Sequence, residues 1–175
     1  TYFGWVDGTF QMLTEEQIDG SILAKIGGAI AWIFTPLGWG NWQAAVASIT
    51  GLVAKENIVG TLGILYGGAE TYQNLALAFT GITGFSFMVF NLLCAPCFAA
   101  MGAIKREMNN AKWTWFAIGY QCCFAYVIAL MINQFGGAFT GSLNILGLIV
   151  AIALLVGIVY MLFKPYQEAT KLKTR

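Results

Sequence analysis

The chain has 175 residues, of which 58% are hydrophobic and 10% are charged, with a net charge of +1 and no histidine. Because an ordinary soluble domain carries about 25% charged residues, this composition excludes a soluble globule and predicts an all-α, polytopic membrane protein. The balanced charge leaves no basic excess for a nucleic-acid partner, and the missing histidine removes imidazole as a metal ligand or catalytic base.

The first 20 residues precede the first apolar run and are polar and aromatic. They carry four acidic residues and no Lys or Arg, and they show no clear helical period. We therefore expect residues 1–20 to form an extracytoplasmic loop. The chain begins at Thr1 rather than at Met and has no signal-peptide pattern, so we expect it to be a fragment of a longer protein.

Residues 21–70 contain short apolar runs that are repeatedly interrupted. The run at 22–34 has 13 residues, which is about 20 Å of helix and too short to cross a bilayer upright. It ends at Pro36 and Gly38, and a second run of 13 residues follows at 42–54. Two short arms around a Pro/Gly turn predict a re-entrant hairpin or broken helices, a pattern typical of substrate sites in secondary transporters.

Charged residues follow the second short run. Lys55 and Glu56 lie between uncharged stretches of 29 and 13 residues, and a charge at membrane depth costs at least about 2.5 kcal/mol, so such residues mark functional sites by default. We expect Glu56 to be an oxygen ligand or ion relay, with Asn57 and Thr61 as neutral oxygens one turn around. Lys55 is a further candidate for the transport path. The alternative is a structural role, in which the buried charges pair with groups elsewhere.

Three longer runs predict full transmembrane helices at residues 82–104, 113–133 and 143–163. Each supplies 21 to 23 uncharged residues, and a bilayer requires about 20. The Gly-rich residues 134–142 are expected to form the turn between the last two helices. The sequence therefore predicts three full spans plus the hairpin, or five spans in all.

The positive charges predict the orientation in the membrane. Lys105, Arg106 and Lys112 flank one short loop, and residues 164–175 hold four more basic residues, whereas residues 1–20 hold none. We expect the loop and this tail to be cytoplasmic and the N-terminal segment to be outside. An odd number of crossings is then required, and both three spans with a returning hairpin and five spans satisfy it.

Sulfur-bearing residues are the candidate metal ligands. Cys94 and Cys97 are three residues apart, and Met101 follows four residues later, so on a continuous helix they share one face. Pro96 has no amide hydrogen, which leaves the Leu92 carbonyl free at the same level. A thiolate and a carbonyl at a kink would suit a transient site for a borderline divalent ion. The alternative is that these side chains only pack.

The adjacent Cys122 and Cys123 give a weaker signal, because neighbouring residues on a helix face different sides. We interpret them as packing residues. All four cysteines lie in apolar stretches, which disfavours both a disulfide scaffold and a thioredoxin-type redox motif.

Four segments of the chain carry a recognisable pattern: residues 21–28 (SILAKIGG), 36–45 (PLGWGNWQAA), 50–62 (TGLVAKENIVGTL) and 94–107 (CAPCFAAMGAIKRE). Together they resemble the C-terminal membrane portion of the bacterial ferrous iron transport protein B family, and the resemblance runs from about residue 21 to residue 163. It implies the second of that family's two Gate regions, an Fe(II) permease in the bacterial inner membrane. It also implies two partners, a regulatory GTPase domain that would bind GTP and a first Gate region, and no part of this chain resembles either of them. Cys97 matches the family's Pro-Cys pair, which is implicated in the iron pathway.

The leading prediction is a fragment of an Fe(II) permease, with Fe(II) as the transported ion and no permanently bound cofactor. Its expected partners are the lipid bilayer, Fe(II) and the rest of the transporter, and the sequence leaves a homo-oligomer open. Two alternatives are a non-transporting assembly module and the core of another small-solute transporter, such as a nucleoside carrier. The spans offer few polar side chains for a nucleoside besides Asn91, Gln121 and Asn133. Without a nucleophile and base pair, an enzyme is not expected.

Overall fold

The computed structural model describes residues 3–6, 9–12, 21–67, 71–141 and 145–164. Near the N-terminus, strands β1 (Phe3–Val6) and β2 (Thr9–Met12) pair antiparallel, with Phe3 opposite Met12 and Val6 opposite Thr9. The sequence predicts only a loop there, because each strand is four residues long and too short to show a period. The rest of the predicted loop lies outside the described residues.

The predicted broken region begins with helix α1 (Ile22–Phe34), whose first turn is capped by the Ser21 side chain accepting from the Ala24 amide at 3.0 Å. A 3-10 turn, η2 (Thr35–Leu37), follows, and Gly38 reverses the chain with a φ of 89° that favours glycine. Helix α2 (Trp42–Gly51) then leaves at 96° to α1 and η2. The predicted hairpin of broken helices is confirmed, although its second arm ends at Gly51 rather than at residue 54.

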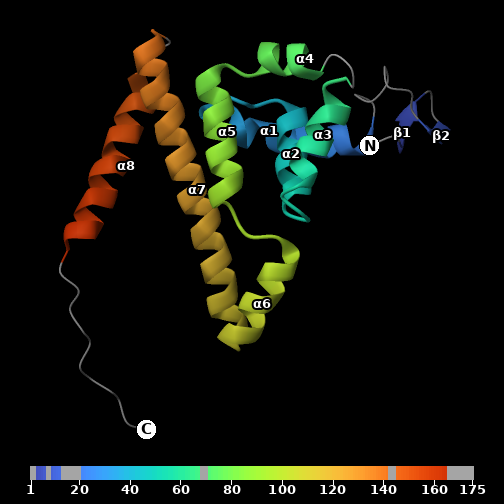
Figure 1. Ribbon diagram of the computed structural model, residues 1–175. Helices are drawn as coiled ribbons and strands as arrows, with labels where there is room; N and C mark the ends of the chain where they lie inside the picture. The colour runs from blue at the N-terminus through green and yellow to red at the C-terminus, as the bar shows by residue number, and fades with distance from the viewer. Residues whose placement is uncertain (1–2, 7–8, 13–20, 68–70, 142–144, 165–175) are drawn as a thin grey trace.

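Two short helices connect this hairpin to the long spans. Helix α3 (Asn57–Leu65) packs against α2, and helix α4 (Thr71–Ala78) lies across one end of the molecule (Figure 1). At 9 and 8 residues, neither can cross a bilayer. The three predicted spans all follow α4 in the chain.

The first long span is broken in the middle. Helix α5 (Gly81–Leu93) starts with a capping box between Thr80 and Thr83, and helix α6 (Phe98–Met108) follows after four residues without helix. Together they cover 28 residues and count as one candidate span. The predicted span over residues 82–104 is confirmed as one candidate span, and it is broken at Pro96, where the sequence predicts a kink.

The other two spans are continuous. Helix α7 (Ala111–Thr140) has 30 residues and helix α8 (Ile145–Phe163) has 19. The predicted turn at residues 134–142 is wrong for its first seven residues, which continue α7 until Gly141 ends it. Gly136 shows why glycine is used there: a Cβ on it would overlap Ile82 of α5, so the residue permits a close helix crossing rather than a turn.

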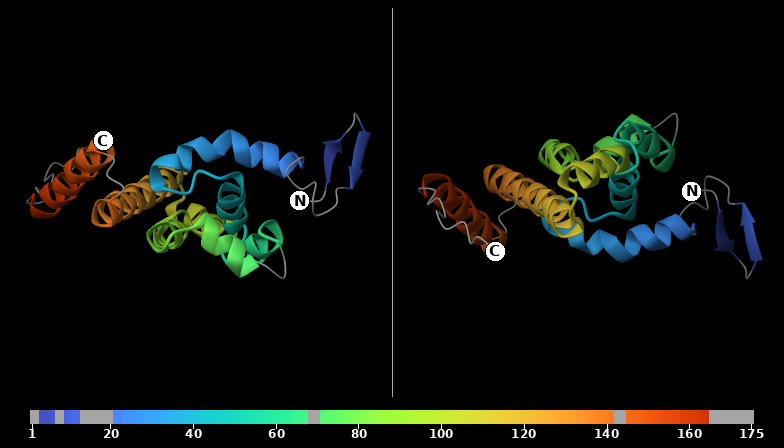
Figure 2. Two further views of the ribbon diagram at one scale, coloured as in Figure 1. Left: turned by 90° about the horizontal axis from the view of Figure 1, so that it is seen from above. Right: turned by 90° about the horizontal axis from the view of Figure 1, so that it is seen from below.

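The long helix α7 is the centre of the molecule. Helix α5 packs along it and α8 returns beside it, toward the end where α6 meets α7 (Figure 1). Helices α1, α2 and α3 gather on the side of α7 away from α8 (Figure 2). Within the described residues, three helices are long and apolar enough to cross a membrane, or four if the bent pair counts as one span. The prediction of three full spans plus a broken-helix region is confirmed, and five spans are not found among these residues.

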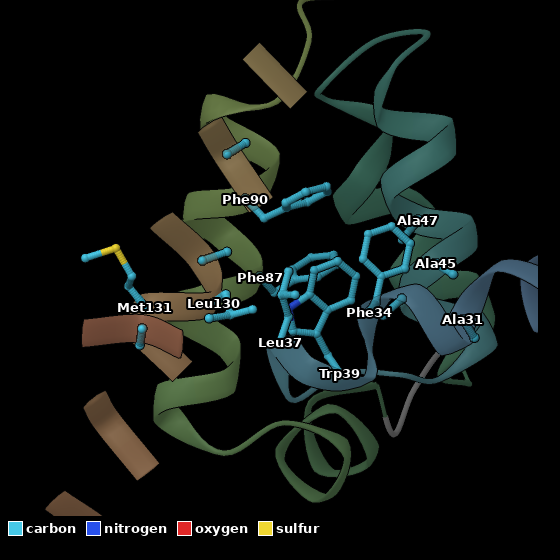
Figure 3. Close-up of a cluster of buried hydrophobic side chains, with 14 residues drawn as sticks. Ala31, Phe34, Leu37, Trp39, Ala45, Ala47, Phe87, Phe90, Leu130 and Met131 are labelled. Atoms are coloured by element: carbon cyan, nitrogen blue, oxygen red, sulfur yellow. The ribbon is translucent and has the colours of Figure 1, made fainter. Parts of the chain in front are cut away.

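An aromatic cluster joins the hairpin to α5 (Figure 3). Phe34 and Trp39 stack with ring centroids 4.4 Å apart, and the edge of Phe87 meets Trp39 at 5.0 Å. Each such aromatic pair contributes about 0.5–1.5 kcal/mol beyond the area it buries. The hairpin tip is therefore held by packing on α5.

Much of the outer surface is apolar. Phe139, Leu77 and Phe163 are 92%, 87% and 83% exposed, and long rows of exposed Leu, Ile and Val cover α8. Extensive exposed apolar surfaces cause association of a soluble protein, whereas in a bilayer such surfaces face lipid. The chain is thus a multi-pass membrane protein.

Candidate functional site

Two interruptions of helix meet at a partly exposed place in the molecule. The first is the turn at residues 52–56 between α2 and α3, and the second is the break at residues 94–97 between α5 and α6. The Phe98 amide donates to the Leu52 carbonyl at 3.1 Å, and Lys55 Nζ donates to the Leu92 carbonyl at 2.9 Å. The charged turn and the sulfur-bearing break, far apart in the sequence, form one site.

The sequence of the α5–α6 break explains this meeting. Proline has no amide hydrogen and its ring crowds the carbonyl four residues earlier, so the helix cannot continue through Pro96. Carbonyls at a helix end lack intrahelical donors, and inside an apolar span each unsatisfied group is costly. The Leu92 carbonyl is the one that the sequence predicts to be free, and Lys55 supplies its donor.

The predicted sulfur face is not present. Cys94 ends α5 and Cys97 precedes α6, with extended backbone at both residues, so the prediction that Cys94, Cys97 and Met101 share one helix face is wrong. Only Cys97 and Met101 remain close together, since the Met101 amide donates to the Cys97 carbonyl at 2.9 Å in the first turn of α6. The Cys94 thiol instead points to α7, where it lies 3.5 Å from the sulfur of Cys122.

The predicted oxygen ligands lie around the N-terminus of α3. Glu56 and Asn57 are exposed, and half-buried Thr61 shares a hydrogen bond of 3.1 Å with Thr50 of α2. Within the part of the chain that the structure describes, no three cysteine and acidic side chains gather closely enough to hold one ion. Glu56 and the cysteines are therefore separate candidates and do not form a single ligand set.

A second polar region surrounds the hairpin tip. The Pro36 carbonyl accepts hydrogen bonds from Asn133 Nδ2 and Gln134 Nε2 of α7, each at 3.1 Å. Both residues line a cavity of about 660 Å³ between η2, the start of α5 and α7. Four threonines also line the cavity: Thr35, Thr80, Thr83 and Thr140.

Sequence reasoning missed most of these groups. It noted Asn133 only as a polar residue in a span and placed Gln134 in a turn, and it did not single out Tyr126, whose hydroxyl donates to the Ile33 carbonyl at 2.7 Å. All three side chains of α7 satisfy backbone carbonyls at the break between α1 and α2. The sequence did contain one signal of this region: the adjacent side-chain amides of Asn133 and Gln134 lie in a long uncharged run, and polar groups at membrane depth need hydrogen-bond partners.

The first region offers soft sulfur ligands beside one positive charge, and the second offers neutral oxygen ligands. Thiols of Cys94 and Cys97 lie at the first, together with the Lys55 ammonium. Hydroxyl, amide and carbonyl oxygens line the second. Such groups suit the brief binding of a borderline divalent ion, which has to be released again, or the hydrogen bonding of a neutral polar solute.

The family model described as "Gate: Nucleoside recognition" matches residues 12–111, which is more than half of the chain. The chain belongs to the Gate family. This Gate match runs from β2 to the start of α7, so it contains both helix breaks and the hairpin, whereas Cys122, Asn133 and Gln134 lie beyond it.

Curated relatives of this Gate chain are named as iron transporters. The chain is 41% identical over 123 residues to "Fe(2+) transporter FeoB" of Methanocaldococcus jannaschii, covering 69% of this chain and 18% of that protein. It is 36% identical over 125 residues to FeoB of Staphylococcus aureus strain COL, covering 70% and 19%. It is 30% identical over 138 residues to an "Fe(2+) transport protein A/Fe(2+) transporter FeoB fusion protein" of Porphyromonas gingivalis, covering 69% and 16%.

The chain thus spans less than a fifth of the length of these relatives. The family resemblance seen in the sequence is confirmed. No solved structure gives a significant match to the chain.

Proposed function

We propose that this Gate chain forms part of a permease that moves Fe(II) across the inner membrane of a bacterium. The meeting of two helix breaks carries the proposal, because irregular backbone inside apolar spans is tolerated only where it is buried or lines a path. Lys55 and the Leu92 carbonyl mark this meeting point. The similarity to Fe(2+) transporters supports Fe(II) as the ion.

The same proposal includes an orientation and partners. The positive charges support a cytoplasmic location for the loop between α6 and α7 and for residues 164–175, with residues 1–20 outside. A GTPase domain and a first Gate region complete the transporter, as the family resemblance implies, and GTP acts only through that domain. Because transport resides in the complete protein, every test uses the full-length transporter.

Along its path the ion binds to sulfur ligands at one place and to an oxygen ligand at another. Cys97 and Cys94 provide sulfur at the break, with Met101 in the following turn, and Glu56 provides a carboxylate at the exposed end of α3. The Lys55 ammonium donates to the Leu92 carbonyl, an oxygen that could also bind a passing cation. We propose that Lys55 leaves this oxygen when an ion passes.

Uptake of radioactive Fe(II) under reducing conditions tests the proposal. Pro96→Ala allows α5 to continue into α6, so uptake should fall at least tenfold while the protein remains folded in the membrane. Gly102→Ala is the matched control on α6, since a Cβ there meets no described atom within 4 Å. Wild-type uptake by Pro96→Ala would contradict a path through the break.

A neutral solute is the second candidate, supported by the cavity at the hairpin tip. Its volume of about 660 Å³ falls within the range of small-molecule pockets, roughly 300–1,000 Å³, and the family description contains nucleoside recognition. Uptake of a labelled nucleoside in the same cells separates the candidates. Nucleoside uptake that Gln134→Leu abolishes, with no Fe(II) uptake, would replace the iron proposal.

A further inference from the structure

A second cluster of chemically active side chains lies where the end of α5 meets α7. Cys94 from the end of α5 and Cys122 from α7 place their sulfur atoms 3.5 Å apart. Both line a cavity of about 330 Å³ that is bounded by α1, α2, α5 and α7. Both cysteines are free thiols.

The sulfur separation fits one specific arrangement. A disulfide needs a distance of about 2.05 Å, so the two thiols are not bonded. Two thiolates that bind the same tetrahedral ion at about 2.3 Å each lie about 3.8 Å apart, which is close to the observed separation. An ion between Cys94 and Cys122 requires a shift of only a few tenths of an ångström.

A third group in the cavity points to a ligand independently of the thiols. Ser48 of α2 lines the same cavity, is 8% exposed, and its hydroxyl has no hydrogen-bond partner among the described residues. A buried polar group without a partner costs about 1–3 kcal/mol. An ion in the cavity would give the Ser48 hydroxyl a partner.

We infer that Cys94, Cys122 and Ser48 form a binding site for one thiophilic divalent ion, in which two thiolates and a hydroxyl are the protein ligands. Each thiol gives its proton to the solvent as the ion binds, so two protons leave for each ion. The inference deepens the proposed function, because it rests on Fe(II) as the natural occupant. It assigns Cys94 to a site with Cys122 rather than with Cys97.

The charges at the site agree with this occupant. One divalent ion and two thiolates carry no net charge, so the complex avoids the penalty of burying an unpaired charge in an apolar cavity. The remaining lining of the cavity is mostly apolar and excludes hard, strongly hydrated ions such as Mg²⁺.

Co(II) is a suitable probe, because its thiolate complexes absorb in the near ultraviolet through charge transfer from sulfur. Full-length transporter, purified in detergent and reduced without added thiols, is titrated with Co(II) in the absence of oxygen. Cys94→Ser and Cys122→Ser should each lower the affinity at least tenfold and weaken this absorption. The double variant should lose little more than either single one, since the two thiols act on one ion.

A matched control lies next to one of the proposed ligands. Cys123→Ser changes an exposed neighbour of Cys122 that lines the same cavity. This variant should bind Co(II) as the wild type does. Cys94→Ala and Cys122→Ala repeat the test with apolar replacements, and unchanged melting temperatures without metal exclude misfolding.

Ser48→Ala separates a ligand from a packing residue. Removing an unpartnered buried hydroxyl should leave the metal-free protein as stable or more stable, while the Co(II) affinity falls several-fold. Wild-type Co(II) binding and absorption by Cys122→Ser would overturn the inferred site. Binding lost in Cys94→Ser and Cys122→Ser, together with no Fe(II) uptake by the wild type, would keep the site and refute the transport proposal instead.

Discussion

Substitution of Gly38 tests how the hairpin tip is held. The residue has a φ of 89°, and a Cβ placed on it would lie 2.5 Å from Asn133 Oδ1 and 2.6 Å from Thr83 Cγ2. An alanine in the left-handed region costs about 1–2 kcal/mol, and forcing a methyl into packed atoms costs about 1–3 kcal/mol more. Gly38→Ala should therefore destabilise the protein by about 2–5 kcal/mol.

Gly141 provides the control that isolates the packing contribution. Its φ is 84°, nearly the same as that of Gly38, but a Cβ on it meets no described atom within 4 Å. Gly141→Ala should show only the backbone cost of about 1–2 kcal/mol. The melting temperature of the full-length transporter in detergent, followed by tryptophan fluorescence, measures both variants.

A second substitution, Thr83→Ser, should partly rescue the stability of Gly38→Ala. Thr83→Ser deletes only the methyl group that a Cβ on Gly38 would meet, and it keeps the hydroxyl that caps α5. In the Gly38→Ala background it should restore part of the lost stability, a coupling that independent sites do not show. Equal losses for the Gly38 and Gly141 variants, with no rescue, would refute the packing of the hairpin tip against α5 and α7.

Four further outcomes are expected in the full-length transporter. A single cysteine introduced at Asn110 should react with an impermeant thiol reagent only after the cells are opened, and labelling from outside would invert the proposed orientation. Cys97→Ser should shift uptake from Fe(II) toward Mn(II), because oxygen is a harder ligand; an unchanged Fe(II) to Mn(II) ratio means that Cys97 only packs. Glu56→Gln should abolish Fe(II) uptake while the protein stays in the membrane, whereas degradation of the variant would indicate a structural role. Gln134→Leu removes one of two donors to the Pro36 carbonyl and should lower stability by about 1 kcal/mol, and an unchanged melting temperature would contradict that.

Local signals made part of the fold predictable. The first arm of the hairpin is expected at residues 22–34 and is found there, because Ser21 caps its start and Pro36 and Gly38 end it. The last span is found at Ile145–Phe163 and ends at its predicted residue, while residues 143 and 144 of the prediction lie outside the described residues. At the first arm of the hairpin, neighbours in the sequence decide where the helix begins and ends.

Contacts between distant segments explain what the sequence did not reveal. The glycines before Thr140 resemble a turn in the sequence, but Gly136 faces Ile82 of another helix. Pro96 was recognised as a disturbance, yet only the contact of Lys55 with Leu92 shows what fills the break. The pairing of Cys94 with Cys122 depends on how α5 lies on α7, which no residue spacing specifies.

The dependence of the hairpin on α7 bears on how the chain can be divided. The family match ends at residue 111, but the donors to the Ile33 and Pro36 carbonyls come from Tyr126, Asn133 and Gln134. A protein cut after residue 111 would leave these carbonyls facing lipid without partners, a state that bilayers do not tolerate. The end of the family match is therefore not a folding boundary, and a unit that satisfies these carbonyls has to extend at least through Gln134.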